Sequence, residues 1–172
     1  GTVQYTAYVQ GQEVGAANIT TSQITGNFVV QPVNDSATVV APSHVSGLED
    51  QRIPLAISVT LEDSSEQIAS VTLSNVPDGV LVFAGNDAMG TQAINLGSGN
   101  WGIALIGGLL PSHISLLPPP NWSGEINNLQ LGVWSGEAGL DPTLTTSFIN
   151  VTVNGVADGI ILTPTLSFGN AG

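Results

Sequence analysis

The sequence contains no cysteine and only one basic residue, Arg52. Without cysteine the fold has no disulfide, and no thiolate can act as a nucleophile or a metal ligand. A single base excludes binding to nucleic acid or to an anionic membrane surface, because both depend on lysine and arginine. No apolar run approaches the roughly 20 residues of a membrane-spanning helix. We therefore expect no nucleic-acid partner and no membrane insertion.

Against this one base stand 13 acidic residues, which give a formal charge of −12. Carboxylates in such excess repel one another and destabilise a compact fold. A multivalent cation relieves this repulsion, and Ca²⁺ is the hard cation that carboxylate and carbonyl oxygens bind. We therefore expect bound calcium ions. The alternative is that the acidity only keeps the chain soluble.

Apolar and polar residues alternate along most of the chain, which is the pattern of β-strands. Segments 53–61, 129–133 and 149–153 all alternate in this way. Turn sequences such as Pro77-Asp78-Gly79 recur roughly every ten residues, and no segment has the pattern of a helix. Short strands at this spacing predict an all-β sandwich or barrel.

An internal repeat divides the chain. The Glu-X-Gly sequence at Glu13 returns at Glu137, 124 residues later, and the acidic residue Asp35 returns as Asp158, 123 residues later. Repeats of this kind form a linear array in which each repeat contacts only its neighbours. We expect three parts: residues 1–35 as the last strands of a preceding or split repeat, residues 36–158 as a complete β-sandwich, and residues 159–172 as the start of a following repeat.

The acidic residues cluster beside the predicted joints between repeats. Glu49-Asp50 and the acidic segment 62–66 flank the predicted strand 53–61. A strand of that length spans roughly 30 Å, so the two clusters should serve different ends or edges of the sandwich.

A hairpin-loop acid, a linker acid and acids from the next repeat can converge on one joint to supply calcium ligands. On this basis we expect Glu13 to meet Asp35, and Glu137 to meet Asp158. The candidate calcium ligands are Glu13, Asn34, Asp35, Glu49, Asp50, Glu62, Asp63, Glu66, Glu137 and Asp158.

Several motifs resemble the tandem repeats of cadherin-like and Bap-like adhesins. They are Pro-Val-Asn-Asp at 32–35, Leu-Glu-Asp at 48–50, Asp-Ser-Ser-Glu at 63–66 and Val-Asn-Gly-Val-Ala-Asp at 153–158. The resemblance covers essentially the whole chain. It implies an immunoglobulin- or cadherin-like β-sandwich with calcium between the repeats. It also implies an extender segment of an RTX-type adhesin, exported by type I secretion to the bacterial cell surface.

Two departures from the family pattern bear on the calcium sites. Ser64 stands where the family has glycine in its Asp-Gly-Ser-Glu motif, and Ala157 stands where the first linker has Asn34. We expect one of the two sites to be weaker as a result.

Other functions have less support in the sequence. His44 and His113 belong to no nucleophile elbow and to no zinc-binding His-Glu-X-X-His motif, so we expect no enzymatic activity. The alternative is a ligand-binding module of the same kind of adhesin, with Trp122 and Trp134 available to contact a sugar or a peptide. The repeated terminal strands favour a monomeric spacer whose partners are neighbouring repeats of the same polypeptide.

Overall fold

The computed structural model describes residues 1–15, 17–157 and 159 of the 172-residue chain. The described residues contain no helix, which confirms the predicted all-β class, and accordingly none that could cross a membrane. Their strands are β1 Thr2–Gly11, β2 Thr20–Val29, β3 Thr38–Val40, β4 His44–Leu48, β5 Ile53–Leu55, β6 Ser58–Thr60, β7 Glu66–Ser74, β8 Leu81–Gly85, β9 Thr91–Gln92, β10 Ile94–Gly97, β11 Asn100–Ile103, β12 His113–Leu117, β13 Gly124–Glu137 and β14 Thr143–Asn154.

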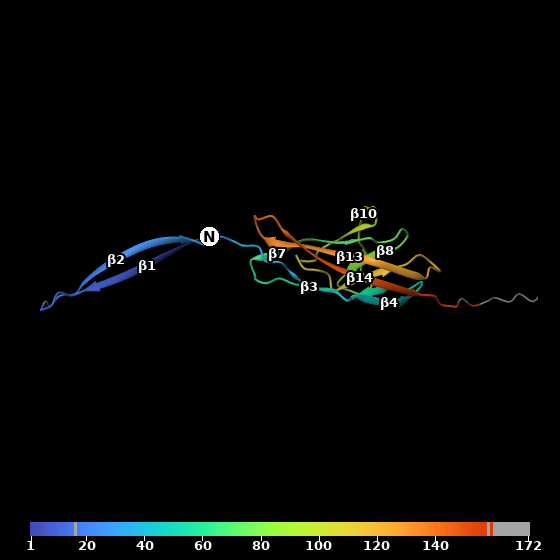
Figure 1. Cartoon of the computed structure of the whole chain (residues 1–172), viewed down its shortest axis with the longest axis horizontal. Helices are drawn as coiled ribbons and strands as arrows, with labels where there is room; N and C mark the ends of the chain where they lie inside the picture. The colour runs from blue at the N-terminus through green and yellow to red at the C-terminus, as the bar shows by residue number, and fades with distance from the viewer. Residues whose placement is uncertain (16, 158, 160–172) are drawn as a thin grey trace, which may run out of the picture.

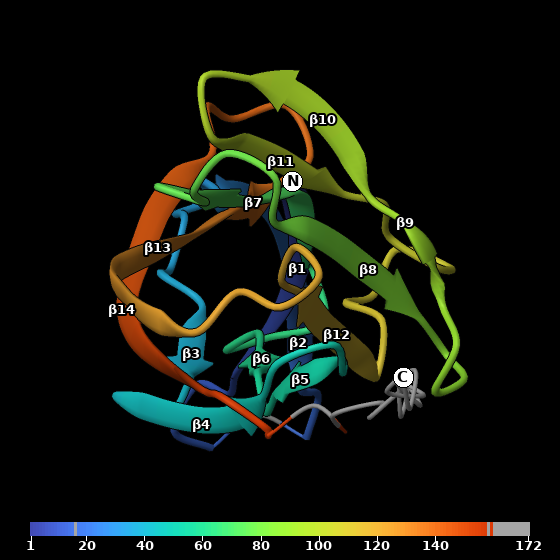
Figure 2. The same ribbon diagram turned by 90° about the vertical axis from the view of Figure 1, so that its right-hand side faces the viewer.

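Two facing sheets form the body of the molecule, residues 37–157 (Figure 2). The larger sheet has the strand order β10-β11-β7-β13-β14-β4, and the smaller sheet has the order β5-β12-β8-β9. Their strands are antiparallel to their neighbours, except that β4 runs parallel to β14. A short antiparallel pair, β3 with β6, completes the body.

The core lies between the two sheets and is built from alternate residues of the strands. Leu131 and Val133 of β13 are fully buried, as are Leu73 of β7 and Leu116 of β12, whereas Trp134 of β13 faces outward. Full burial of one such side chain contributes roughly 1.5–3 kcal/mol. The period-two pattern of the sequence therefore supplies the contact between the sheets.

The prediction of one continuous strand over 53–61 is wrong. Residues Ile53–Leu55 form β5 in the smaller sheet, whereas Ser58–Thr60 form β6, which pairs with β3. The Ile57 N–H donates to the Leu55 carbonyl oxygen at 3.0 Å, which turns the chain from one pairing partner to the other. Because the alternation of apolar residues continues through this turn, the pattern does not reveal the break.

Strands β1 and β2 form an antiparallel hairpin that extends away from the body (Figure 1). On its apolar face, Val3, Tyr5 and Phe28 are 43%, 50% and 51% exposed. In the internal sequence repeat, this hairpin corresponds to β13 and β14. The residues there that correspond to Tyr5 and Phe28 are Leu131 and Val151, which are fully buried. A two-stranded hairpin is marginally stable in water at best, so this face requires a covering layer.

Candidate functional site

The strands of the body carry the acidic residues to two opposite ends. Glu66 pairs with Glu137 at one end of the β7–β13 ladder, while Leu48 pairs with Asn154 where β14 stops. At roughly 3.3 Å per residue, the length of β13 separates these ends by about 40 Å. We define the entry end by Asn34, Asp35, Glu62, Asp63, Glu66 and Glu137, and the exit end by Glu49, Asp50 and Val156.

Glu66 is the buried acid of the entry end, with 6% of its surface exposed. It begins β7 on the same inward side as Ile68, so the alternation of the strand directs it to the open end of the sandwich. One carboxylate oxygen accepts the Asp35 N–H at 2.7 Å, and the other accepts the Glu62 N–H at 3.2 Å. Glu66 therefore joins the linker backbone to the acidic loop of the body.

Asn34 docks the same linker onto the loop between β13 and β14. Its Oδ1 accepts the Glu137 N–H at 2.8 Å, and its Nδ2 donates to the Asp141 carbonyl oxygen at 2.6 Å. Gly136 gives the amide room, because a Cβ there would lie 2.8 Å from Nδ2 of Asn34. The Asn34 side chain thus holds the linker through hydrogen bonds to the backbone of β13 and of the loop that follows it.

The loop at Asp63 is organised by Ser65. One Asp63 oxygen accepts the Ser65 hydroxyl at 2.6 Å and the Ser65 N–H at 2.7 Å. These two hydrogen bonds, the hydroxyl first, hold the pKa of Asp63 below its ordinary value of 3.8. The Ser65 hydroxyl also lies 3.0 Å from Oε1 of Glu137, and the Thr38 hydroxyl donates to Glu62 at 3.1 Å. The entry end therefore gathers acids from the linker, the loop and the β13 hairpin.

The exit end uses a second buried glutamate. Glu49 is 7% exposed, and its Oε1 accepts the Val156 N–H at 2.5 Å while its own N–H donates to the Asn154 carbonyl oxygen at 2.9 Å. Asp50 follows in the left-handed region, with φ of 60°, which aspartate tolerates better than most residues. Its Oδ1 accepts the Asn121 N–H at 2.9 Å. A buried glutamate thus binds linker backbone at each end of the body.

The predicted meeting of Glu13 with Asp35 is wrong. Glu13 lies in the loop of the β1–β2 hairpin, ten residue pairs from the end that joins the linker. Glu137 lies beside the upstream linker residue Asn34, because β14 carries the chain across the whole body before the downstream linker begins. Asp158, the other member of that predicted pair, is outside the described residues.

The donors at the entry end are all oxygen atoms, from five carboxylates and the Asn34 amide. This set has the chemistry that Ca²⁺ prefers, with no soft ligand among it. In the described part of the chain, no three acidic or histidine side chains converge as a metal centre. Both oxygens of Glu66 accept backbone N–H groups, whereas the Asp35 carboxylate forms no hydrogen bond with another described residue.

Two serines that form hydrogen bonds at or near the entry end were not predicted from the sequence. Ser135 is fully buried in β13, and its hydroxyl accepts the Ala37 N–H at 3.2 Å. Nothing in the sequence marks Ser135 except its inward place in the alternation. Ser65 could have been found, because Asp-X-Ser is a pattern in which the carboxylate binds the backbone two residues on.

No model of a known protein family matches the chain, and a search of curated proteins finds no similar one. The resemblance to cadherin-like and Bap-like repeats therefore depends on the motifs at the linkers and at the acidic loop.

Proposed function

We propose that the chain is a calcium-stiffened extender segment of an RTX-type bacterial adhesin, built from immunoglobulin- or cadherin-like repeats and exported to the cell surface by type I secretion. The observation that carries this proposal is the capture of linker backbone by a buried glutamate at each end. Glu66 accepts the Asp35 N–H, and Glu49 accepts the Val156 N–H. A linker bound in this way cannot swivel freely, and a rigid joint is what a spacer needs. No catalytic step is part of this function.

Because the sequence repeats, both contacts between a buried glutamate and linker backbone would occur at every linker of an array. Residues 155–158 correspond to residues 32–35, so each linker in an array faces a Glu49-type residue of the preceding repeat and a Glu66-type residue of the following one. Small polar contacts between domains leave their orientation free by default. Two captures on one short linker remove much of that freedom even before a cation binds.

Calcium would be bound by the more exposed acids of the entry end, with Glu66 holding the backbone of Asp35 and Glu62 in place. Asp35, Glu62, Asp63 and Glu137 supply carboxylates from three segments that are far apart in the sequence. A cation shared by these segments opposes bending, because bending has to break coordination. It also offsets part of the repulsion among the 13 acids.

The exposed apolar face of the β1–β2 hairpin supports neighbouring repeats as the partners. Its counterpart in the body, β13–β14, is covered by the smaller sheet and flanked by β7 and β4. We propose that strands of an adjacent repeat of the same polypeptide cover the hairpin in the same way. The functional form is then a monomeric rod of repeats.

The test is calcium titration followed by melting temperature and small-angle scattering. A ligand that binds the native state alone stabilises it by about 2.7 kcal/mol at a hundredfold excess over Kd. Extracellular calcium sites have Kd values of roughly 10⁻⁴ to 10⁻³ M, so about 10 mM calcium should raise the melting temperature, with a narrower and longer particle. Coincident melting curves and scattering profiles in calcium and in chelator would reject the proposal.

A matched pair of variants separates specific binding from diffuse counter-ion binding. Asp35→Asn removes a carboxylate that makes no hydrogen bond with the described residues, so the fold should survive while the calcium response falls. Asp78→Asn makes the same charge change in an exposed turn beyond the far end of β7, outside the entry end. Equal losses in the two variants would show that calcium binds only as a diffuse counter-ion.

A further inference from the structure

Arg52 forms no ion pair with any described residue, although the chain has 13 acids and no other lysine or arginine. Its guanidinium instead lies over the Phe83 ring, 3.7 Å from the centroid, and Nη1 donates to the Met89 carbonyl oxygen. Stacking of this kind fixes the orientation of a guanidinium while leaving other N–H donors directed outward. Arg52, the one lysine or arginine of the chain, is therefore held in place without a carboxylate partner among the described residues.

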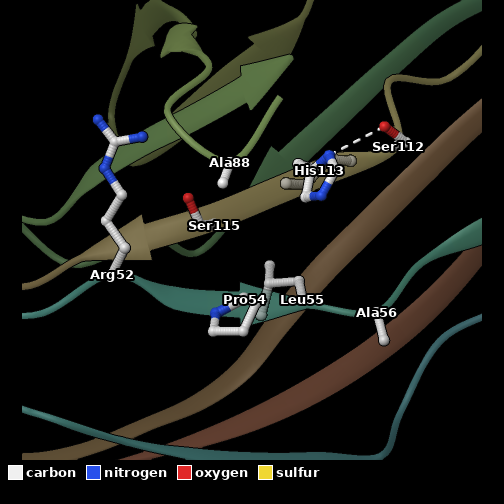
Figure 3. A pocket seen from close by; sticks show the side chains of 9 residues that line it. Arg52, Pro54, Leu55, Ala56, Ala88, Ser112, His113 and Ser115 are labelled. Carbon is white, nitrogen blue, oxygen red and sulfur yellow. Dashed lines mark hydrogen bonds between the residues drawn. The ribbon is translucent and has the colours of Figure 1, made fainter. Parts of the chain in front are cut away.

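Arg52 lines a cleft of about 390 Å³ on the outer face of the smaller sheet (Figure 3). In the register of that sheet, Ser115 of β12 lies between Pro54 of β5 and Phe83 of β8. The aliphatic part of the lining is Pro54, Leu55, Ala56, Ala88 and Ile114. This volume lies at the lower end of the range for small-molecule sites, roughly 300–1,000 Å³, and suits one amino-acid residue or one sugar ring.

The polar groups of the cleft complement Arg52. Ser115 lies between Arg52 and His113 in Figure 3. The Ser112 hydroxyl lies 2.9 Å from Nδ1 of His113, which orients the imidazole, and Nε2 has no partner among the described residues. The cleft thus combines a fixed cation, hydroxyl groups and an imidazole with an aliphatic floor.

We propose that this cleft binds the terminal carboxylate of a peptide that ends in an aliphatic residue. A planar guanidinium pairs with a carboxylate through two parallel N–H bonds, and the aliphatic side chain would lie against Pro54 and Ala56, the exposed apolar residues of this lining. The lining favours this ligand over an acidic sugar, because it contains no phenylalanine, tyrosine or tryptophan, and Arg52 covers the nearby Phe83 ring. This binding activity is separate from the calcium joints, since no lining residue belongs to the entry end or the exit end.

The test uses N-acetyl-L-leucine as the probe and chemical shifts of the backbone amides as the readout. The experiment is done in chelator at about 0.15 M salt, where the Debye length of roughly 8 Å screens repulsion by the other acids. About 12 non-hydrogen atoms at the usual ligand efficiency correspond to a Kd in the millimolar range. We expect saturable shifts at Ala88, His113 and Ser115, and at least tenfold weaker binding of N-acetyl-L-leucinamide, which lacks the charge.

Two variants complete the test. Arg52→Met keeps an unbranched stem over Phe83 and removes the charge, while Ala88→Glu places a carboxylate at the exposed rim beside Arg52. Each should weaken binding of the probe at least tenfold, and Ala88→Glu keeps the test decisive if Arg52→Met does not fold. Unsaturated shifts at 50 mM probe, equal binding of the amide, or tighter binding of glucuronate would each overturn the proposal. Because calcium is absent, none of these outcomes bears on the extender function.

Discussion

Replacement of Glu66 by alanine should destabilise the body substantially when no calcium is present. Glu66 is 6% exposed and accepts N–H groups from Asp35 and Glu62 at 2.7 and 3.2 Å. A hydrogen bond to a charged group contributes about 1.5–3 kcal/mol, so two bonds set an upper range of about 3–6 kcal/mol. Both donors belong to exposed residues, and water can recover part of this loss. We therefore expect a decrease of about 3 kcal/mol in the free energy of unfolding.

The opposing effect is relief of repulsion among the acids of the entry end. Glu66→Gln separates the two effects, because it removes the charge but keeps the size and one acceptor. Its amide NH₂ would face the second backbone donor, so about one of the two hydrogen bonds should be lost. If the hydrogen bonds outweigh the repulsion, the stability order is wild type, then Glu66→Gln, then Glu66→Ala.

Urea unfolding in chelator, monitored by tryptophan fluorescence, measures this order. Gln67 is the matched control, since it is the exposed neighbour of Glu66 on β7 and Gln67→Ala should change stability by about 0.5 kcal/mol or less. Near the melting temperature, 3 kcal/mol corresponds to a shift on the order of 10 °C for a body of this size. A Glu66→Gln variant more stable than wild type would show that repulsion dominates, and that Glu66 does not act as a structural link to the linker.

Two further predictions concern the same end. Gly136→Ala should displace the Asn34 amide, which a Cβ would approach to 2.8 Å, and so increase fast backbone motion of the linker in ¹⁵N relaxation measurements; unchanged relaxation at Asn34 would contradict the docking. Because the pKa of Asp63 is lowered, its stabilising contribution is complete above pH 3.8 and is lost as the pH falls through the lower, folded-state value. Ser65→Ala should raise the pKa of Asp63 toward 3.8 in a ¹³C-detected titration of the carboxylate, and an unmoved pKa would show that another group holds it down.

The all-β class and the separation of the acids into two clusters could be predicted from the sequence. Alternation of apolar residues depends on side-chain direction alone, and β13 shows it with Leu131 and Val133 inward. Alternation does not report which strand is the partner, so the change of sheet between Leu55 and Ser58 was missed. The burial of Glu66 was equally out of reach, because the composition of an acidic loop does not show which carboxylate faces backbone donors.

The grouping of the loop acids follows from the length of the strands that connect them. β14 spans Thr143–Asn154 and therefore carries the chain roughly 40 Å from the loop at Glu137 to the exit end. In the β1–β2 hairpin, β2 likewise separates Glu13 from the linker at Asp35. An acid in this hairpin loop must lie at the start of its own repeat, where Glu137 meets Asn34, and cannot reach the linker that follows. In the proposed array, the acids that face any one linker would therefore come from the exit end of the repeat before it and from the entry end of the repeat after it. A bend moves those two ends relative to each other, so the cation proposed at the entry end, which would bind the linker residue Asp35 together with acids of the body, would resist the bend.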